Sequence, residues 1–187
     1  GTQMISKGLD FSNVKVVGHL NADNMLNYPD FRSYERSYQL MAQVGGRAGR
    51  KKGRGKVIIQ TSDPKNPIIQ SVINNDYHSV YHGQSDERKR FTYPPFCRLI
   101  KITLKHKRKS ILNIASDDLA NRFNSLTELQ TIGPESPLIS RIQNMNLKSI
   151  LLKLKKDSNL SKTKIQIRDC INCILDKKTW IITTSNM

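Results

Sequence analysis

The sequence predicts an α/β protein in which a parallel-sheet part is followed by an α+β part. The apolar run at residues 14–20 is typical of a buried strand in a parallel sheet. Residues 98–107 and 147–156 instead alternate apolar and basic side chains, as strands with one open face do. Between the run at 14–20 and the alternating segments, Pro94 and Pro95 force extended backbone and end any helix. We therefore expect two domains, residues 1–92 and residues 93–187.

In the first part, strands and helices are expected to alternate. The strand at residues 14–20 is followed by a loop at 21–30, which lies at the carboxyl end of the strand, where open α/β sheets place their ligands. Residues 32–44 predict a helix whose apolar stripe is more typical of core than of a base-stacking platform. That stripe consists of Tyr34, Tyr38 and Met41. The other expected elements are a strand at 56–61 and a helix at 66–81.

The second part predicts three further strands and two helices after the strand at 98–107. A helix at 110–126, capped by Ser110, should bury Ile111, Ala115, Leu119 and Phe123. The remaining elements are a bent strand-like segment at 130–143, a strand at 147–156, a helix at 159–175 and a strand at 179–184. This β-α-β-β-α-β order predicts a ferredoxin-like domain.

In such a domain both helices cover one face of the sheet, and the other face is open. The period-two pattern places lysines from two strands on that open face, and this arrangement could follow a phosphate backbone with little sequence preference. The lysines are Lys101, Lys105, Lys153 and Lys155. An ordinary solvated face, or a face packed on the first domain, would give the same pattern.

The charge of the chain is strongly positive. Its 31 Lys and Arg residues outnumber its 15 Asp and Glu residues, for a formal net charge of +16. Such a surplus predicts a polyanionic partner. Compositional drift in an AT-rich genome could explain part of it. The sequence has neither a run long enough to span a membrane nor a signal-peptide pattern, so we expect no membrane partner and a cytoplasmic protein.

No metal site is expected from the cysteines and histidines. Cys170 and Cys173 lack a second pair at zinc-ligand spacing, and core or boundary positions suit them better. His78 and His82 are four residues apart but lack a third ligand. The three cysteines also do not form a disulfide framework.

Residues 43–50, Gln-Val-Gly-Gly-Arg-Ala-Gly-Arg, are the most distinctive stretch of the chain. Arg47 and Arg50 are three residues apart and fall on one side of a helix or tight turn. Glycines leave room for a phosphate to approach the backbone, and guanidinium groups bind phosphate oxygens through paired donors. The stretch therefore fits an arginine finger for phosphoryl transfer. A solvated basic turn is the alternative interpretation.

Residues 43–50 resemble motif VI of superfamily 2 helicases, and residues 1–11 resemble their motif V. Three further stretches, in the correct order, resemble the PriA family of replication-restart DNA helicases (primosomal protein N-prime). These are Pro29-Asp30-Phe31-Arg32-Ser33-Tyr34-Glu35-Arg36, Glu87-Arg88 before Tyr93-Pro94-Pro95-Phe96, and Ile132-Gly133-Pro134. Nearly the whole chain is covered. The chain opens with Gly1 inside a motif, so we expect it to be a piece of a longer protein.

The resemblance implies that residues 1–92 are part of a RecA-like helicase lobe. Gln43, Arg47 and Arg50 would then lie at the edge of an ATP site, with Arg50 as the finger. Thr2, Gln3 and Lys7 would contact the DNA strand. ATP, Mg²⁺ and zinc are implied for the full-length protein, with the zinc-binding cysteines before motif V. This chain has no Walker A or Walker B sequence, so alone it is predicted to lack ATPase activity.

The resemblance also implies a function for the full-length protein. It would be an ATP-dependent 3′-to-5′ DNA helicase that recognises stalled or branched forks and initiates primosome assembly. Its partners would be forked or single-stranded DNA, other primosome proteins and single-strand-binding proteins. The alternative is a non-enzymatic nucleic-acid-binding module. A general superfamily 2 RNA helicase is disfavoured, because the stretches at Pro29 and Tyr93 resemble the PriA family instead.

Overall fold

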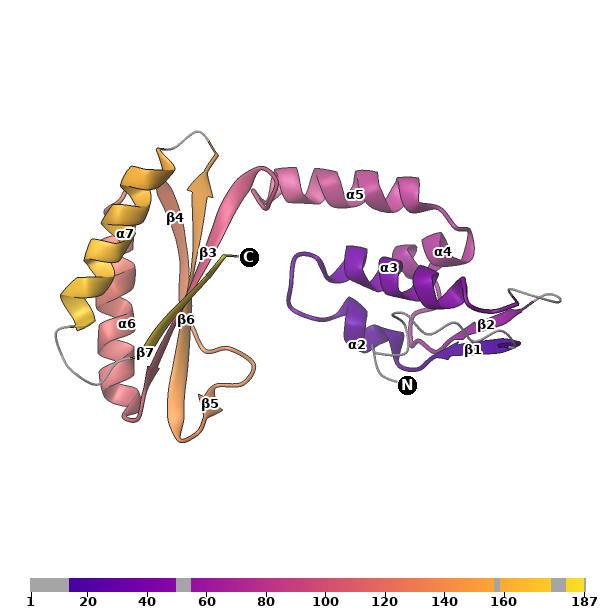
Figure 1. Cartoon of the computed structure of the whole chain (residues 1–187), viewed down its shortest axis with the longest axis horizontal. Helices are drawn as coiled ribbons and strands as arrows, with labels where there is room; N and C mark the ends of the chain where they lie inside the picture. Colours follow the sequence, from indigo (N-terminus) through magenta and orange to yellow (C-terminus); the bar gives the residue numbers. More distant parts are fainter. Residues whose placement is uncertain (1–13, 50–54, 157–158, 176–180, 187) are drawn as a thin grey trace. The chain divides into compact units, whose positions relative to one another are not determined.

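The computed structural model describes residues 14–49, 55–156, 159–175 and 181–186. The chain divides into two compact units, Gly1–Arg90 and Phe91–Met187. Figure 1 shows both units, and each is described by itself below.

The first unit combines a two-stranded parallel sheet with four helices. Strands β1 (Val16–His19) and β2 (Lys56–Ile59) pair in parallel, which confirms the α/β class predicted for this part. The helices are α2 (Ala22–Leu26), α3 (Ser33–Gly45), α4 (Pro67–Ile73) and α5 (Tyr77–Arg90). In Figure 1, α3 lies between the strands and α5. The core of the unit consists of Ala22, Leu26, Tyr38, Met41, Ile68, Ile69 and Val80.

Three predictions for this unit were wrong in part. The predicted loop at 21–30 contains the short helix α2. The predicted helix at 66–81 is two helices, because Asn75 adopts a left-handed conformation with φ 55° and the chain starts again at α5. Asp76 then caps α5, its carboxylate accepting hydrogen bonds from the backbone N–H (3.0 Å) and hydroxyl (2.5 Å) of Ser79. Tyr34 is exposed, whereas Tyr38 and Met41 are core, as expected.

The second unit is a five-stranded antiparallel sheet with two helices. The strands lie in the order β4-β6-β3-β7, and the two-residue β5 pairs with β6. They are β3 (Cys97–His106), β4 (Leu129–Glu135), β5 (Arg141–Ile142), β6 (Met145–Lys155) and β7 (Ile181–Asn186). The helices are α6 (Lys109–Asn124) and α7 (Leu160–Leu175). This order confirms the predicted β-α-β-β-α-β plan.

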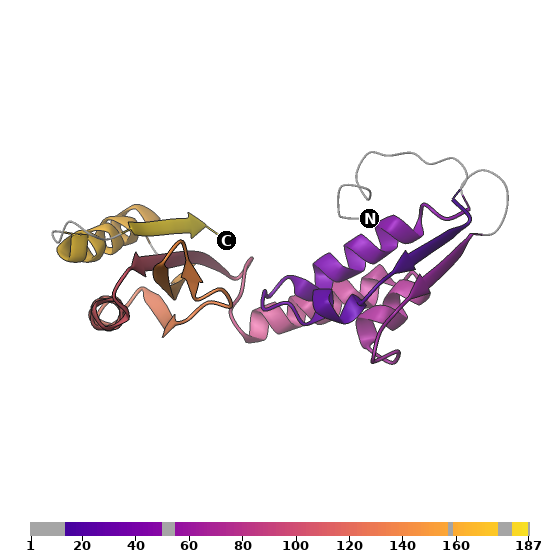
Figure 2. The same cartoon turned by 90° about the horizontal axis from the view of Figure 1, so that it is seen from below.

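Both helices cover the same face of this sheet (Figures 1 and 2). Side chains from α6 and α7 share one core with alternate residues of β3 and β6. The core includes Ile102, Leu104, Phe123, Ile150, Leu152 and Ile171. Among the described residues of this unit, no helix covers the opposite face of β3 and β6.

The start of α6 and the middle of β4 differ in detail from expectation. Ser110 lies inside α6, and the N-cap position belongs to Arg108. The buried residue of this first turn is Leu112, 1% exposed, instead of Ile111, 37% exposed. The predicted bend in β4 is present, because the register shifts between Ile132 and Glu135 and Gly133 has φ 99°.

Candidate functional site

The arginine motif forms a tight turn at the end of α3. The N–H of Arg47 donates to the carbonyl of Val44 at 3.0 Å, and that of Ala48 to the carbonyl of Gly45 at 3.1 Å. The N–H of Gly49 reaches the carbonyl of Val14 at 2.9 Å, just before β1. On the other side, a Cβ added to Gly55 would lie 2.3 Å from the carbonyl carbon of Ala48. The turn is thus fixed from both sides by backbone.

Two of the predicted nucleotide-contacting residues lie in or next to this turn. Gln43 is exposed on the last turn of α3, and Arg47 is half-buried in the turn that follows. Arg50, together with Thr2, Gln3 and Lys7, lies outside the described residues. The turn lies next to the amino ends of β1 and β2. Gly49 bonds to Val14, just before β1, and Gly55, which touches Ala48, directly precedes Lys56, the first residue of β2.

The carboxyl ends of these strands, where a ligand loop was expected, are instead joined by Asp23. Its carboxylate accepts hydrogen bonds from the hydroxyl of Thr61 at 2.5 Å and from the N–H and hydroxyl of Ser62 at 2.8 and 2.7 Å. These bonds hold the pKa of Asp23 below its usual value. At this end, α2 is therefore bonded to the segment that follows β2.

A groove of about 560 Å³ runs beside α3 and ends at Gln43. Its walls come from α2, the loop after it and one side of α3. The lining residues are Asn24, Met25, Tyr28, Asp30, Ser33, Arg36, Ser37, Gln39, Leu40 and Gln43.

Asp30 fixes the start of α3 with two arginines. Its Oδ1 accepts from the N–H of Arg32 at 2.9 Å and from Nε of Arg32 at 3.1 Å. Its Oδ2 accepts from Nη1 of Arg36 at 3.2 Å. Burial raises the pKa of Asp30, but the hydrogen bonds and charge of Arg32, with the charge of Arg36, outweigh it and lower that pKa overall.

Arg88 joins α5 to α3. Its guanidinium forms an ion pair with Glu35. The guanidinium carbons of Arg88 and Arg32 lie 5.1 and 4.8 Å from the ring centre of Phe31. Sequence reasoning gave no roles to these charged residues. In the sequence, these residues were marked only by their position within the stretches that resemble the PriA family.

In the second unit, four lysines share the face opposite the helices, as predicted. Directly paired residues of antiparallel strands point to the same side, and the β3–β6 register pairs Lys101 with Leu151 and Lys105 with Leu147. It likewise pairs Cys97 with Lys155 and Leu99 with Lys153. Lys155 is exposed, and Lys101 and Lys105 are half-buried.

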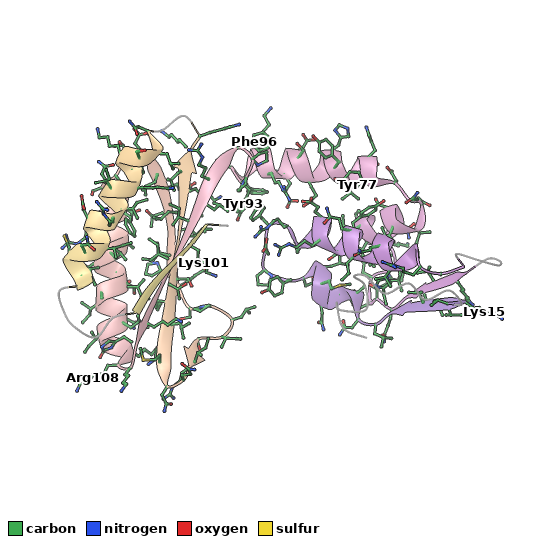
Figure 3. All side chains as sticks on the ribbon, in the orientation of Figure 1. Lys15, Tyr77, Tyr93, Phe96, Lys101 and Arg108 are labelled. Atoms are coloured by element: carbon green, nitrogen blue, oxygen red, sulfur yellow. The ribbon has the colours of Figure 1, made fainter. Side chains whose placement is uncertain are left out.

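Lys153 differs from the other three because it is only 7% exposed. Its Nζ donates to the carbonyl oxygen of Phe91 at 2.7 Å and lies 4.0 Å from the ring centre of Tyr93. We call residues 91–96 the anchored segment (Figure 3). This packing does not favour the predicted contact between Lys153 and a phosphate, because its ammonium group is already bound to the segment.

A second bond links the start of the anchored segment to the residue that follows the segment. The thiol of Cys97 donates to the carbonyl oxygen of Thr92 at 3.1 Å, and the N–H of Phe96 donates to the carbonyl of Tyr93 at 2.9 Å. Burial raises the pKa of the Cys97 thiol, an effect that Lys153 partly offsets. The thiol is therefore a neutral donor at physiological pH.

Among the described residues, no group of three or more His, Cys, Asp or Glu side chains could hold a metal ion. Cys170 is half-buried and Cys173 is exposed on α7. The Nε2 atoms of His78 and His82 lie 3.2 Å apart on α5. In the part of the chain that the structure describes, no helix is long and apolar enough to cross a membrane.

Comparison with known proteins finds close relatives. The chain is 39% identical over 163 residues to replication restart protein PriA of Bacillus subtilis, covering 86% of this chain and 20% of that protein. The PriA protein of Borreliella burgdorferi is 32% identical over 184 residues, covering 94% of this chain and 28% of that protein. The chain thus spans 20% to 28% of the length of these relatives.

Two other comparisons add no argument. No family model matches the chain. A hydantoinase/carbamoylase family amidase from Burkholderia ambifaria is 7% identical, with a TM-score of 0.34 over 49% of this chain and 27% of that chain, which is too low a score to indicate a shared fold. The sequence relatives are more than 30% identical to the chain and cover nearly all of it. The chain therefore belongs to the PriA family of replication restart proteins and corresponds to their C-terminal part.

Proposed function

We propose that the chain is the C-terminal part of an ATP-dependent 3′-to-5′ DNA helicase that recognises stalled or branched replication forks and initiates primosome assembly. The motif VI turn supports this role most directly, because backbone contacts fix Gln43 and Arg47 at the end of α3. The relatives carry the name replication restart protein PriA, which supports the same role. The first unit would be part of a RecA-like lobe.

In this proposal Arg47 and Arg50 bind the γ-phosphate of ATP, and Gln43 contacts the nucleotide edge. A fixed guanidinium neutralises charge that develops during phosphoryl transfer without reorganising. ATP with Mg²⁺ would supply the transferable phosphoryl group, and the donor set of two arginines and an amide suits that anion. The chain has no Walker A or Walker B sequence, so by itself it should not hydrolyse ATP.

DNA would be bound by both units. Thr2, Gln3 and Lys7 would couple the strand to the nucleotide edge. Lys101, Lys105 and Lys155 would contact phosphates, with low sequence preference and strong salt dependence. Other primosome proteins and single-strand-binding proteins are the proposed protein partners, and the cytoplasm is the proposed location.

Substitution in the full-length helicase tests the nucleotide role. We expect Arg50→Ala to lower DNA-stimulated ATP hydrolysis by roughly 10³- to 10⁵-fold, the range measured for arginine fingers, while DNA binding is retained. Arg47→Ala and Gln43→Ala should also lower the rate. Lys65→Ala is the matched control, because Lys65 is exposed and distant from the motif in sequence. A rate unchanged by Arg50→Ala would overturn the finger assignment.

Fluorescence anisotropy of the 187-residue chain tests the DNA role. Forked DNA, plain duplex and single-stranded DNA are compared across a salt series. Binding that prefers the fork and persists at moderate salt would support fork recognition by this part of the protein. Weak binding to all three that disappears with salt would mean that the charge acts generically.

A non-enzymatic nucleic-acid-binding module is the second candidate, and the shared lysine face of the second unit favours it. That unit has a hydrophobic core of its own, so residues 91–187 can be tested alone. DNA affinity that survives intact in residues 91–187 would assign binding to this unit. Affinity that requires residues 1–90 would assign it to the helicase motifs.

A further inference from the structure

Positive charge is concentrated where β3 ends and α6 begins. Residues 105–109 read Lys-His-Lys-Arg-Lys, and we call them the basic turn. Figure 3 shows Arg108 at the opposite end of β3 from Phe96. The sequence on either side adds no acid, because residues 97–116 and 136–156 contain neither Asp nor Glu. The charge of the basic turn is therefore not offset by its neighbours along the chain.

Side chains from β3 and β6 hold the backbone of the basic turn. The side-chain amide of Asn146, on β6, donates to the carbonyl oxygen of Lys107 at 2.7 Å. His106 is buried, and its Nδ1 accepts a hydrogen bond from the backbone N–H of Arg108 at 3.0 Å. The side chains of Lys107, Arg108 and Lys109 are exposed. A fixed backbone beneath exposed cations reduces the conformational entropy that is lost when they bind a partner.

Strand β5 adds another exposed cation beside the basic turn. Arg141 pairs with Asn146, which in turn pairs with His106, so these three residues form one row across neighbouring strands. Neighbouring strands are about 4.8 Å apart, which places the backbone of Arg141 about 10 Å from that of His106. Arg141 therefore extends the charge of the basic turn across the end of the sheet.

These charges are not neutralised within the part of the chain that the structure describes. There, no ion pair involves any of the five cations, which are Lys105, Lys107, Arg108, Lys109 and Arg141. Adjacent like charges repel one another, and a cation at the amino end of a helix is unfavourable because the helix dipole is positive there. The first turn of α6 has no acidic residue that would offset this. An anionic partner would relieve the repulsion.

The residue types around the basic turn indicate which anion it suits. Residues 97–122 and 136–156 contain no Phe, Tyr or Trp, so these segments offer no ring on which an unpaired base could stack. In a duplex the bases are already stacked, and its backbone binds through phosphate contacts alone. Duplex DNA carries one negative charge per about 1.7 Å of its axis, so it can engage cations about 10 Å apart at the same time.

We propose that the basic turn, together with Arg141, binds the phosphate backbone of duplex DNA. The five cations contact phosphates, and the contact is independent of base sequence. This inference rests on the proposed function and assigns to the basic turn the contact with a duplex arm of a fork.

Anisotropy of the 187-residue chain with a short labelled duplex, across a salt series, tests the site. The variant combines Lys107→Gln, Arg108→Gln and Lys109→Gln. We expect the magnitude of its salt slope to fall by about 2.7, because each lost phosphate contact removes about 0.9. The same loss corresponds to a roughly 10²- to 10³-fold weaker affinity at about 0.1 M salt.

A control variant with the same change in net charge separates this site from the general charge of the chain. It combines Lys162→Gln, Lys164→Gln and Arg168→Gln, all at exposed positions of α7. We expect its salt slope to equal that of the wild type. Circular dichroism should give the wild-type spectrum for both variants, because every substituted side chain is exposed.

Acetylation of lysines gives a second readout on the unsubstituted chain. An amine-reactive acetyl ester modifies exposed lysines, and mass spectrometry of the peptides measures the extent at each one. We expect bound duplex to protect Lys107 and Lys109 severalfold. Lys162 and Lys164 should react equally with and without DNA.

The outcomes distinguish this site from the proposed function. If the wild type binds the duplex and the variant of the basic turn binds equally well, the site is wrong while the proposed DNA role stands. Equal losses in the two variants would also refute the site, because the charge would then act generically. Protection of Lys107 and Lys109 by polyglutamate but not by the duplex would assign the turn to an acidic protein instead. If the wild type binds neither forked nor duplex DNA, the proposed DNA role itself fails.

Discussion

The burial of one lysine reduces the number of positive charges that the sheet face of the second unit can offer to a partner. Of the four lysines on one sheet face, Lys153 is bound to the anchored segment, whereas Lys155 is exposed. The two lie on the same strand and the same face, two residues apart. The bond from Lys153 to Phe91, 62 residues earlier in the chain, and the contact of Lys153 with the ring of Tyr93 account for its burial.

Lys153→Met is expected to loosen the anchored segment without removing a phosphate contact. Methionine keeps much of the apolar stem but leaves the carbonyl of Phe91 without its donor, which should lower the free energy of unfolding by roughly 1–3 kcal/mol. Urea denaturation measures this loss. The salt slope of DNA binding should stay at the wild-type value, because Lys153 is not among the proposed phosphate contacts. A slope reduced as much as in Lys101→Ala would show instead that Lys153 contacts a phosphate.

Asp30→Asn is expected to destabilise the first unit in a pH-dependent way. The pKa of Asp30 is lowered in the folded state, so its stabilisation is fully present above the unfolded value of about 3.9 and is lost as the pH falls through the lower, folded value. Wild type and variant should therefore differ by roughly 1–3 kcal/mol near pH 7 and converge in acid. Urea denaturation across pH 3–7 is the measurement. Asp86→Asn, at an exposed position of α5, is the control, and a difference that persists unchanged to pH 3 would refute the assignment.

The side of a strand on which a residue lies could be predicted from the sequence, but not what covers it. Period-two alternation put Lys101, Lys105, Lys153 and Lys155 on one face, and the register confirms this. The burial of Lys153 depends on a distant segment, which no local pattern encodes. Arg88 escaped notice for the same reason, since its partner Glu35 lies on another element. Asp30 was missed although its partners Arg32 and Arg36 are close to it in the sequence.

At the scale of the element, the helices were located well and their interruptions poorly. The strands β1 and β2 and the helix α3 lie where apolar patterns predicted them. The α4–α5 break was missed because apolar residues continue across it, while the signal for the break was the pair Asn74-Asn75. Asparagine tolerates the left-handed conformation, so this pair can end a helix without glycine.

Substitutions at Asn75 test that explanation. Because Asn75 has φ 55° and is exposed, Asn75→Val should destabilise the chain by roughly 1–2 kcal/mol through backbone strain alone. Asn75→Gly should be neutral or slightly stabilising, since glycine enters this region without strain. Chemical denaturation of the two variants gives the comparison. Equal destabilisation by valine and glycine would mean that the asparagine side chain, and not its backbone, is what matters.

At the scale of the whole molecule, two separate cores organise the chain. The first unit is packed around Tyr38, Met41 and Ile69, and the second around Ile102, Phe123 and Leu152. The two prolines near residue 94 predicted a boundary in this region, and the compact units divide between Arg90 and Phe91. Each unit should therefore unfold as a cooperative group of its own.

Thermal unfolding should reveal two transitions. The chain has one tryptophan, Trp180, which belongs to the second unit, so its fluorescence reports that unit, whereas far-ultraviolet circular dichroism reports both. We expect a single fluorescence transition that coincides with one of two dichroism transitions. Residues 91–187 alone should reproduce the fluorescence transition. Coincident single transitions by both probes would show instead that the units unfold together.

Two glycines, Gly49 in the arginine motif and Gly55 after it, are required by backbone geometry and not by a nucleotide. Gly49 has φ 77°, and Gly55 has no room for a Cβ beside Ala48. A descendant that stopped hydrolysing ATP would still need both glycines to fold, whereas nothing in the packing of α3 obliges it to keep Gln43, which is exposed. In relatives that have lost ATPase activity, substitutions should therefore appear first at the amide and guanidinium side chains. The two glycines should be retained, because the fold needs them. The amide and guanidinium side chains of the motif, and not the two glycines, therefore indicate whether such a protein still hydrolyses ATP.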